Sequence, residues 1–377
     1  MEGGRVVRNL SVDVLRGIGI LSVVAGHASS GVGLYPFTPY SFHMPLFFFL
    51  SGIFFSESHR EKVVSVLKKN VRALLLYSTF FYFAYACVCL ILDFYGFSSF
   101  SEPFSIKKIF LNQFGGSGAY VFTAAYWFIP CLFFVRVYFS VIHARLFGML
   151  SRHVDGKSTV SILFLLVYFL LGLAAVGYSV AMYNSQAVDW GKIPYLRFAF
   201  ALFFYYLGAL FQKYNLQRFL KHVFVIAALY AIQQQLWVAA GNLDFWMQAS
   251  KYQNAYLPVV SSVLSIAFFY AVSDILAKNQ SCSNVLGYIG RNSFPILLHH
   301  LFGFFLINLV LCAAGIIKPT DIVGPYYQWD TVHTWPVYIV GGTLISLALD
   351  RYLVRPGATW SKQLLLSGWR SIKARRA

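Results

Sequence analysis

Residues 14–33 read VLRGIGILSVVAGHASSGVG, an apolar stretch that carries two ionisable side chains, Arg16 and His27. Its length and apolar character predict a membrane-spanning helix. The two residues are eleven positions apart, so they fall on one helix face, roughly 16 Å apart along the axis. An ionisable group inside a membrane helix costs about 2.5–3.5 kcal/mol on insertion scales and is usually functional. The stretch therefore predicts both a membrane protein and a functional site in its first span.

The composition of the whole chain supports this prediction. Of its 377 residues, 58% are hydrophobic and only 11% are charged, and the mean hydropathy is +0.63. No water-soluble domain of this length has such a composition. We expect an all-α integral membrane protein with about ten transmembrane helices, with nine or eleven as alternatives. The expected spans, of which the second is half a span or a tilted one, are 14–34, 42–56, 72–94, 124–142, 159–178, 195–211, 222–240, 257–276, 293–315 and 335–353.

The distribution of lysine and arginine predicts the orientation in the membrane. With the N-terminus in the cytoplasm, alternating spans place 22 of these residues on the cytoplasmic side and 6 on the other, with Arg16 and Arg136 inside spans. This bias follows the positive-inside rule and puts both termini in the cytoplasm. The net charge of +17 then reflects topology and contact with anionic membrane lipid, and no nucleic-acid partner is expected. We expect a membrane domain over 1–355 and a basic cytoplasmic tail over 356–377.

Several other kinds of site are not expected. The chain has no P-loop, no GxGxxG on a strand-turn-helix and no GxSxG. Its five cysteines have neither CxxC nor His/Cys metal spacing, so we expect no metal site and no permanently bound cofactor. The first span is expected to be retained rather than cleaved as a signal peptide. The polar segment 95–123 is long enough to cover a site.

Two further clusters carry side chains suited to chemistry. Residues 42–52 read FHMPLFFFLSG, and His43 is expected near the outer end of the second span, where it and His27 face one cavity that opens outward. Pro45 frees a backbone carbonyl, which is tolerated in a membrane only where it lines protein or water. Ser51 and the glycine after it allow close helix approach. Residues 290–300 read GRNSFPILLHH and carry two more imidazoles toward the middle of the bilayer.

The first of these patterns resembles a known family. Asp13, Arg16 and, after ten intervening residues, His27 resemble the R-x10-H signature of the acyltransferase-3 family, multispanning bacterial membrane enzymes that O-acylate cell-surface polysaccharides. Residues 17–52 look most like the branch of fucose 4-O-acetylase-like and exopolysaccharide acetyltransferases. Weaker similarities extend the resemblance over nearly the whole chain, at Tyr126-Trp127-Phe128, at Phe204-Tyr205-Tyr206-Leu207-Gly208, and at Ser293 with His300, although many members have Tyr in place of Leu297.

The resemblance implies an O-acyltransferase, foremost an O-acetyltransferase, in the bacterial inner membrane. The donor would be acetyl-CoA or another acyl-CoA, bound as a substrate, and the acceptor a hydroxyl of an exported polysaccharide or its lipid-linked precursor. Polysaccharide assembly machinery is a further expected partner. His27 would be the general base, because the pKa of histidine lies near working pH. Arg16 would bind the phosphates of the donor, and His43 would orient the acceptor or assist proton transfer.

Other candidate site residues carry competing structural interpretations. Asp13 lies three residues before Arg16 and is its natural ion-pair partner. The alternative is that this pair has only a structural role and holds the first span at the membrane interface. His27 can be a helix-packing histidine, and His43 an interfacial one. Further candidates for donor or acceptor binding are Ser51, Trp127, Ser293 and His300, although Trp127 fits an aromatic belt better than a sugar platform. Ser51 is not a candidate nucleophile, because no base can be assigned to it.

Two rival functions stay open. A transporter or flippase for glycans would also suit about ten spans with interior Arg and His, although no inverted repeat is visible. A non-catalytic sensor or assembly subunit is disfavoured by the absence of a signalling domain. Only the constellation of Arg16 and His27 favours chemistry over transport. Direct transfer and an acyl-histidine intermediate are both compatible with these residues, as is transfer on either side of the membrane.

Overall fold

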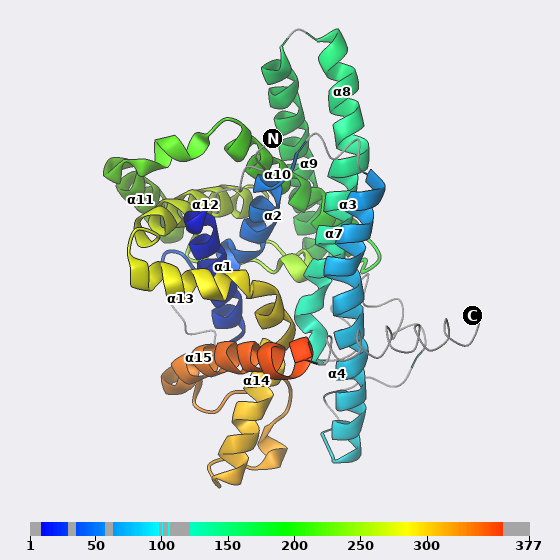
Figure 1. Cartoon of the computed structure of the whole chain (residues 1–377), viewed down its shortest axis with the longest axis vertical. Coiled ribbons are helices and arrows are strands. Elements are labelled where there is room, and N and C mark those ends of the chain that lie inside the picture. The colour runs from blue at the N-terminus through cyan, green and yellow to red at the C-terminus, as the bar shows by residue number, and fades with distance from the viewer. Residues whose placement is uncertain are drawn as a thin grey trace, which may run out of the picture.

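A computed structural model describes residues 9–28, 35–56, 63–97, 100, 105, 121–154 and 156–356 (Figure 1). Most of the segment expected to cover a site, and the basic tail from 357 onward, lie outside the described residues. The described chain consists of helices and connections without a named strand, apart from one isolated bridge between Trp246 and Lys251. The expected all-α fold is therefore confirmed.

The elements follow one another along the chain with η marking 3-10 and π-helical turns. They are α1 (Leu10–Ala28), η1 (Pro39–Ser41), α2 (His43–Ile53), α3 (Val63–Asn70), η3 (Val71–Leu76), α4 (Tyr77–Phe94), η5 (Val121–Trp127), α7 (Phe128–Tyr138), η6 (Phe139–His143), α8 (Ala144–His153), α9 (Lys157–Asn184), α10 (Ile193–Lys213), η7 (Leu216–Lys221), α11 (Val223–Ala240), η8 (Met247–Ala249), α12 (Leu257–Leu276), α13 (Gln280–Arg291), α14 (Ser293–Ala313), η9 (Pro319–Asp321), α15 (Thr331–Leu349) and η10 (Asp350–Val354).

Nine helices in the described ranges are long and apolar enough to cross a membrane. The second expected span, 42–56, is the one that is not found at full length. It corresponds to α2, whose 11 residues rise only about 16 Å and cannot cross a hydrocarbon core of about 30 Å. The two longest spans, Val63–Phe94 and Phe122–His153, exceed the expected ranges 72–94 and 124–142 by the most. Each extends through lysines or arginines at one end, because a helix continues beyond the apolar layer once its backbone bonds are made.

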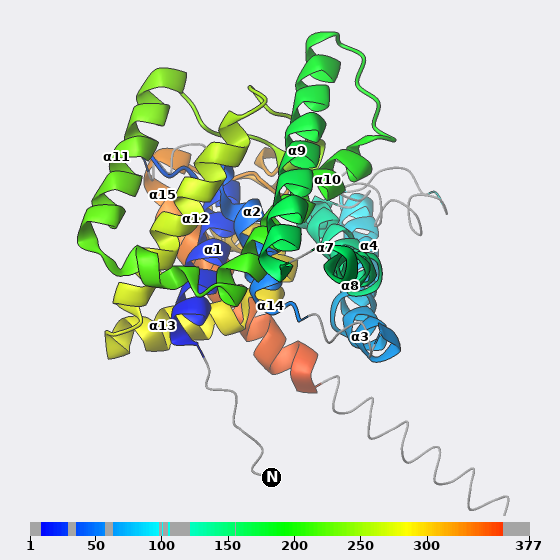
Figure 2. The same cartoon turned by 90° about the horizontal axis from the view of Figure 1, so that it is seen from above.

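Helix α1 lies inside the bundle, where it packs against α2, α12, α13, α14 and α15 (Figure 2). Its closest neighbour is α13, which crosses it in Figure 1. A Cβ atom on Gly17 would overlap the backbone oxygen of Leu286, and one on Gly290 would overlap that of Asp13. The two helices therefore meet backbone to backbone, which only residues without a side chain permit.

The short helix α2 is held in a similar way. A Cβ atom on Gly52 would overlap the backbone of Tyr205 in α10, so the expected close approach at this end of α2 is confirmed. At the other end, Pro45 removes the donor that would bond the carbonyl of Ser41. Ser262 of α12 donates its hydroxyl to that carbonyl at 3.0 Å. Both ends of α2 are thus bound to neighbouring helices.

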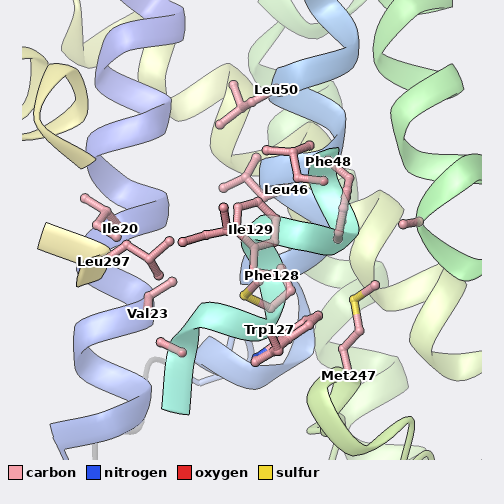
Figure 3. Close-up of a cluster of buried hydrophobic side chains, with 14 of the residues drawn as sticks. Ile20, Val23, Leu46, Phe48, Leu50, Trp127, Phe128, Ile129, Met247 and Leu297 are labelled. Carbon is pink, nitrogen blue, oxygen red and sulfur yellow. The ribbon is translucent and has the colours of Figure 1, made fainter. Parts of the chain in front are cut away.

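A layer of buried apolar side chains fills the space between α1, α2 and α7 (Figure 3). Ile20 and Val23 of α1 face Leu297 of α14 in this layer, with Phe128 of α7 beside them. The layer joins helices far apart in sequence and separates two cavities, described next.

Candidate functional site

The larger cavity has a volume of about 1090 Å³ and lies between α1, η1, α2 and the connections that follow α11 and α14. His27 and His43 line it together, as expected from the sequence. The other lining side chains are mostly aromatic or polar, a composition typical of a ligand site. They include Thr38, Tyr40, Trp127, Trp237, Asn242, Asp244, Phe245, Trp246, Gln248, Lys251, Tyr252, Gln253, Tyr326, Gln328 and Thr331.

His27 lies in the last turn of α1, half-buried at the wall of this cavity. The side chain of Gln328 donates a hydrogen bond of 2.9 Å to its backbone carbonyl. Its ring packs against Tyr326 at 5.3 Å between centroids and against His300 at 5.0 Å, the latter nearly perpendicular at 70°. Its Nδ1 atom is buried and has no hydrogen-bond partner among the described residues. The ring is therefore positioned by packing, with one nitrogen left to bond.

His300 lies behind His27 on α14 and is fully buried. Its Nδ1 lies 2.9 Å from the carbonyl of Ile296 and 3.1 Å from that of Leu297. A carbonyl only accepts, so Nδ1 carries the hydrogen and donates it. In the neutral ring Nε2 then has a free lone pair, and this buried atom has no partner within the described chain. The acceptor nitrogen of His300 thus belongs to a ring whose centroid lies 5.0 Å from that of His27, and both rings have one nitrogen unbonded within the described residues.

His43 begins α2, and its ring is pinned by the backbone before it. Its Nδ1–H donates to the carbonyl of Pro39, and its ring meets Tyr40 edge to face at 5.2 Å. By the same reasoning, the Nε2 of neutral His43 is an acceptor. Tyr40 also stacks on His27 at 6.4 Å, so one tyrosine ring joins the two imidazoles.

Asp244 supplies a negative charge that the sequence analysis missed. It lies after α11 and accepts a hydrogen bond from the hydroxyl of Thr38, just before η1. Burial raises the pKa of Asp244, and the bond from Thr38 partly opposes this. Burial, and then the charge of Asp244, raise the pKa of Tyr40 to about 12. A lone acidic residue in a short connection carries no recognisable motif, which is why sequence alone did not indicate it.

The rest of this connection forms an aromatic and polar rim. Trp246 and Lys251 exchange two backbone hydrogen bonds of 2.9 Å, which close the loop around η8. The Nζ of Lys251 lies 5.6 Å from the ring centroid of Trp246, and this indole is 56% exposed. Exposed aromatic faces beside polar groups suit a ligand with both apolar and hydroxylated surfaces. Neither residue was predicted to belong to a site.

The smaller cavity has a volume of about 210 Å³ and is lined by Arg16, Ser51, Arg136, Ser293 and apolar side chains. The Arg16 guanidinium lies 5.7 Å from the ring centroid of Phe54. Three residues line both cavities, so the two adjoin: Val23, Met44 and Leu297. Arg16 and His27, predicted on one helix face, thus belong to two neighbouring cavities.

Arg136 is a site residue that received no role from the sequence. It lies on α7, where its Nε donates to the Ser51 hydroxyl at 2.8 Å and its Nη1 to the Asn70 side chain at 3.2 Å. Arginine within an apolar span was the signal that could have identified it. Ser51 and Arg136 thus line the smaller cavity side by side, joined by this hydrogen bond.

The remaining predicted residues are buried, and of these Trp127 also lines the larger cavity. Asp13 is buried where α1 meets α13, and its pairing with Arg16 stays a prediction. Trp127 is buried under the guanidinium of Arg197, 5.1 Å from its ring. The Nδ1 of His299 lies 2.8 Å from the Tyr85 hydroxyl on α4. Among the described residues, no three His, Cys, Asp or Glu side chains are grouped to hold a metal ion.

No curated protein and no solved structure is similar enough to the chain to match it. A family model for the acyltransferase-3 family, described as an acyltransferase domain, matches residues 9–351. This range contains both cavities and every residue that lines them. The chain therefore belongs to the acyltransferase-3 family of membrane acyltransferases.

Proposed function

We propose that this protein is an inner-membrane O-acyltransferase that moves an acetyl group from acetyl-CoA to a sugar hydroxyl of an exported polysaccharide or its lipid-linked precursor. The observation that carries the proposal is the position of His27, at the wall of a large polar and aromatic cavity and directly in front of His300. The R-x10-H pattern and the similarity of residues 17–52 to exopolysaccharide acetyltransferases support the choice of reaction and acceptor.

Acyl transfer from a thioester requires a base, a stabilised oxyanion and two reactants held together. In a direct mechanism, the Nε2 of His27 takes the proton of the sugar hydroxyl as its oxygen attacks the thioester carbonyl. The tetrahedral intermediate then expels the thiolate, which takes the proton from the imidazolium and leaves as free coenzyme A. The new ester bond replaces the thioester bond, and the histidine returns to its starting state.

His300 acts in this proposal as a positioning residue for the base. Its Nδ1–H is bound to backbone carbonyls, so its Nε2 is the nitrogen that accepts the Nδ1–H of His27 when the two rings turn toward each other. That bond selects the tautomer in which the Nε2 of His27 is free to accept a proton. A buried partner that orients the catalytic imidazole is the recurring arrangement of histidine-based acyl transfer.

The two cavities suit the two substrates. Arg16 in the smaller cavity is a ligand for a phosphate of the donor. In the larger cavity, Trp246 and Tyr326 offer ring faces for a sugar, and Asp244 offers an acceptor for its hydroxyl groups. His43 contributes its Nε2 to acceptor orientation or proton transfer.

The test is a transfer assay with purified protein in nanodiscs, acetyl-CoA and surface glycan, which measures free thiol and O-acetyl on the sugar. We expect acceptor-dependent thiol release that falls by about 10²- to 10⁴-fold in His27→Ala. Arg16→Gln should raise the KM for the donor. His299→Phe is the matched control, because this neighbouring buried histidine contacts α4 and lines neither cavity.

Full activity of a folded His27→Ala protein would contradict its role as the base. Movement of glycan across the bilayer without thioester consumption would instead indicate a transporter. Genuine transfer requires that both signals, free thiol and sugar ester, rise together in equal amounts.

A further inference from the structure

Arg136 holds a positive charge inside the apolar bundle among neutral partners. Its hydrogen bonds go to Ser51 and Asn70, and no ion pair joins it to a carboxylate among the described residues. Removing a charge from water costs several kcal/mol, which neutral partners do not fully restore. A cation kept at such a cost in a membrane helix is usually functional.

A second guanidinium lines the same cavity. Arg16 reaches it from α1 and Arg136 from α7, and no Asp or Glu is found among its lining residues, all of which are described. Two guanidinium groups on the wall of one cavity of about 210 Å³ make it a favourable place for an anion, whose charge attracts both. Ser51 and Ser293, also on this wall, add hydroxyl groups that can donate to an anion.

The size and position of the cavity limit the class of ligand. Its volume is below the roughly 300–1,000 Å³ of pockets that enclose whole drug-sized ligands, so it fits one or two phosphate groups rather than a nucleotide. Guanidinium groups bind phosphate oxygens through paired hydrogen bonds. The cavity adjoins the larger one at Val23, Met44 and Leu297, so only these side chains separate phosphates bound here from the cavity that His27 lines.

We propose that Arg16 and Arg136 together form a phosphate-binding site, in which Arg136 is the second cationic ligand for the diphosphate of the acyl donor. The donor assignment rests on the proposed function, whereas the anion site itself does not. Arg136 also tethers α7 to α2 and α3 through Ser51 and Asn70. A purely structural role in that tether is the competing explanation that the experiment must separate.

The experiment measures binding in nanodiscs of neutral lipid by calorimetry, with coenzyme A and inorganic pyrophosphate as separate probes. We expect Arg136→Gln to weaken the Kd of both probes by about 10- to 100-fold, the effect of losing charge-assisted hydrogen bonds. Arg136→Lys, which keeps the charge but not the paired donors, should fall between. Arg197→Gln is the matched control, since Arg197 is a buried arginine of α10 that lines neither cavity. The Kd of this variant for each probe should stay within about threefold of the wild-type value.

Thermal unfolding without ligand separates binding from tethering. If the charge is uncompensated, Arg136→Gln should unfold at the same temperature as the wild type or higher, and lose the stabilisation that pyrophosphate confers. A lower unfolding temperature with unchanged pyrophosphate binding, in either Arg136→Gln or Arg136→Lys, would overturn the proposal. So would a wild-type protein that binds neither probe and is not stabilised by anionic lipid.

A further arm uses nanodiscs that contain anionic phospholipid and no coenzyme A. Stabilisation by this lipid that Arg136→Gln abolishes, without coenzyme A binding, would support the anion site and assign it to a lipid headgroup, which overturns the donor role. The proposed function fails separately: acyl transfer with an unchanged donor KM in Arg136→Gln refutes only the site. Pyrophosphate binding that depends on Arg136 in a protein without transfer activity refutes only the function.

Discussion

The rings of His27 and His300 lie 5.0 Å apart between centroids and nearly perpendicular, although 273 positions separate them in the sequence. Each ring has one buried nitrogen without a described partner, Nδ1 in His27 and Nε2 in His300. The second nitrogen of His300 is already bound to its own helix. In the proposed mechanism His300 accepts the Nδ1–H of His27, and the four predictions below test this pair and other parts of the fold.

Replacing His300 should slow catalysis without weakening substrate binding. His300→Leu removes the acceptor for the Nδ1–H of His27, and we expect kcat to fall at least about tenfold with the KM of both substrates nearly unchanged. His300→Gln offers a side-chain oxygen near the position of Nε2 and should recover part of kcat. Steady-state kinetics of the two variants check this. Equal loss in both, with raised KM values, would point to a packing role.

His43 can be tested by separating its two nitrogens. An asparagine at this position keeps a donor near Nδ1 for the Pro39 carbonyl but has no counterpart of Nε2. We expect His43→Asn to unfold at nearly the wild-type temperature while the acceptor KM rises or kcat falls by about tenfold or more. His43→Leu should lose about 1 kcal/mol of stability as well. Wild-type kinetics in His43→Asn would leave only the structural role.

The contact between α1 and α13 should tolerate no side chain at Gly290. Alanine favours helices over glycine by about 1 kcal/mol, so local propensity alone predicts a gain. A Cβ atom here overlaps the backbone of Asp13, which no rotamer change can relieve. We therefore expect Gly290→Ala to lower the free energy of unfolding by about 1–3 kcal/mol or more, seen as a lower thermal unfolding midpoint. Gly324→Ala, with no atom within 4 Å of its Cβ, is the control and should change little.

Asp244 should make stability depend on pH. Burial raises its pKa, so the folded protein holds the proton more tightly than the unfolded chain, whose aspartates titrate near about 3.9. Stability contributed by this group is therefore lost as pH rises from that value through the raised pKa, and is constant above it. Asp244→Asn does not titrate, so its thermal midpoint relative to wild type should increase over this window and then level off. A difference that is flat across the window would contradict the burial of the charge.

The membrane fold was predictable from sequence because the bilayer imposes it. Apolar segments of about 20 residues must become helices there to satisfy their backbone, and nine such helices are found in the described chain. The short second span was recognisable from its length. Several helices were predicted too short because hydropathy does not detect helical turns that continue beyond the apolar layer, as in Phe122–His153.

The local parts of the site were predictable as well. Arg16 and His27 share α1, and the helical period alone brings them to one face. His43 follows one connection later, so its place on the same cavity as His27 was expected and is found. The roles assigned to these three residues stay predictions. Helical period and proximity in the chain relate only residues that are close in sequence. They therefore predict which of these three residues lie together, but not which distant residues join them.

Only the tertiary structure brought the remaining residues to the site. His300 comes from α14, Asp244 from the connection after α11, and Arg136 from α7. Each is far in sequence from the residue that it meets at the site; Arg136, for example, is 85 positions from its partner Ser51. Their positions follow from how closely helices pack, as at Gly17 and Gly290, where backbones touch. The sequence by itself determined the spans and the first helix with its two ionisable groups, because apolar length and helical period are local. Which helix supplies the partner of each group depended on packing between distant segments, a property of the whole bundle.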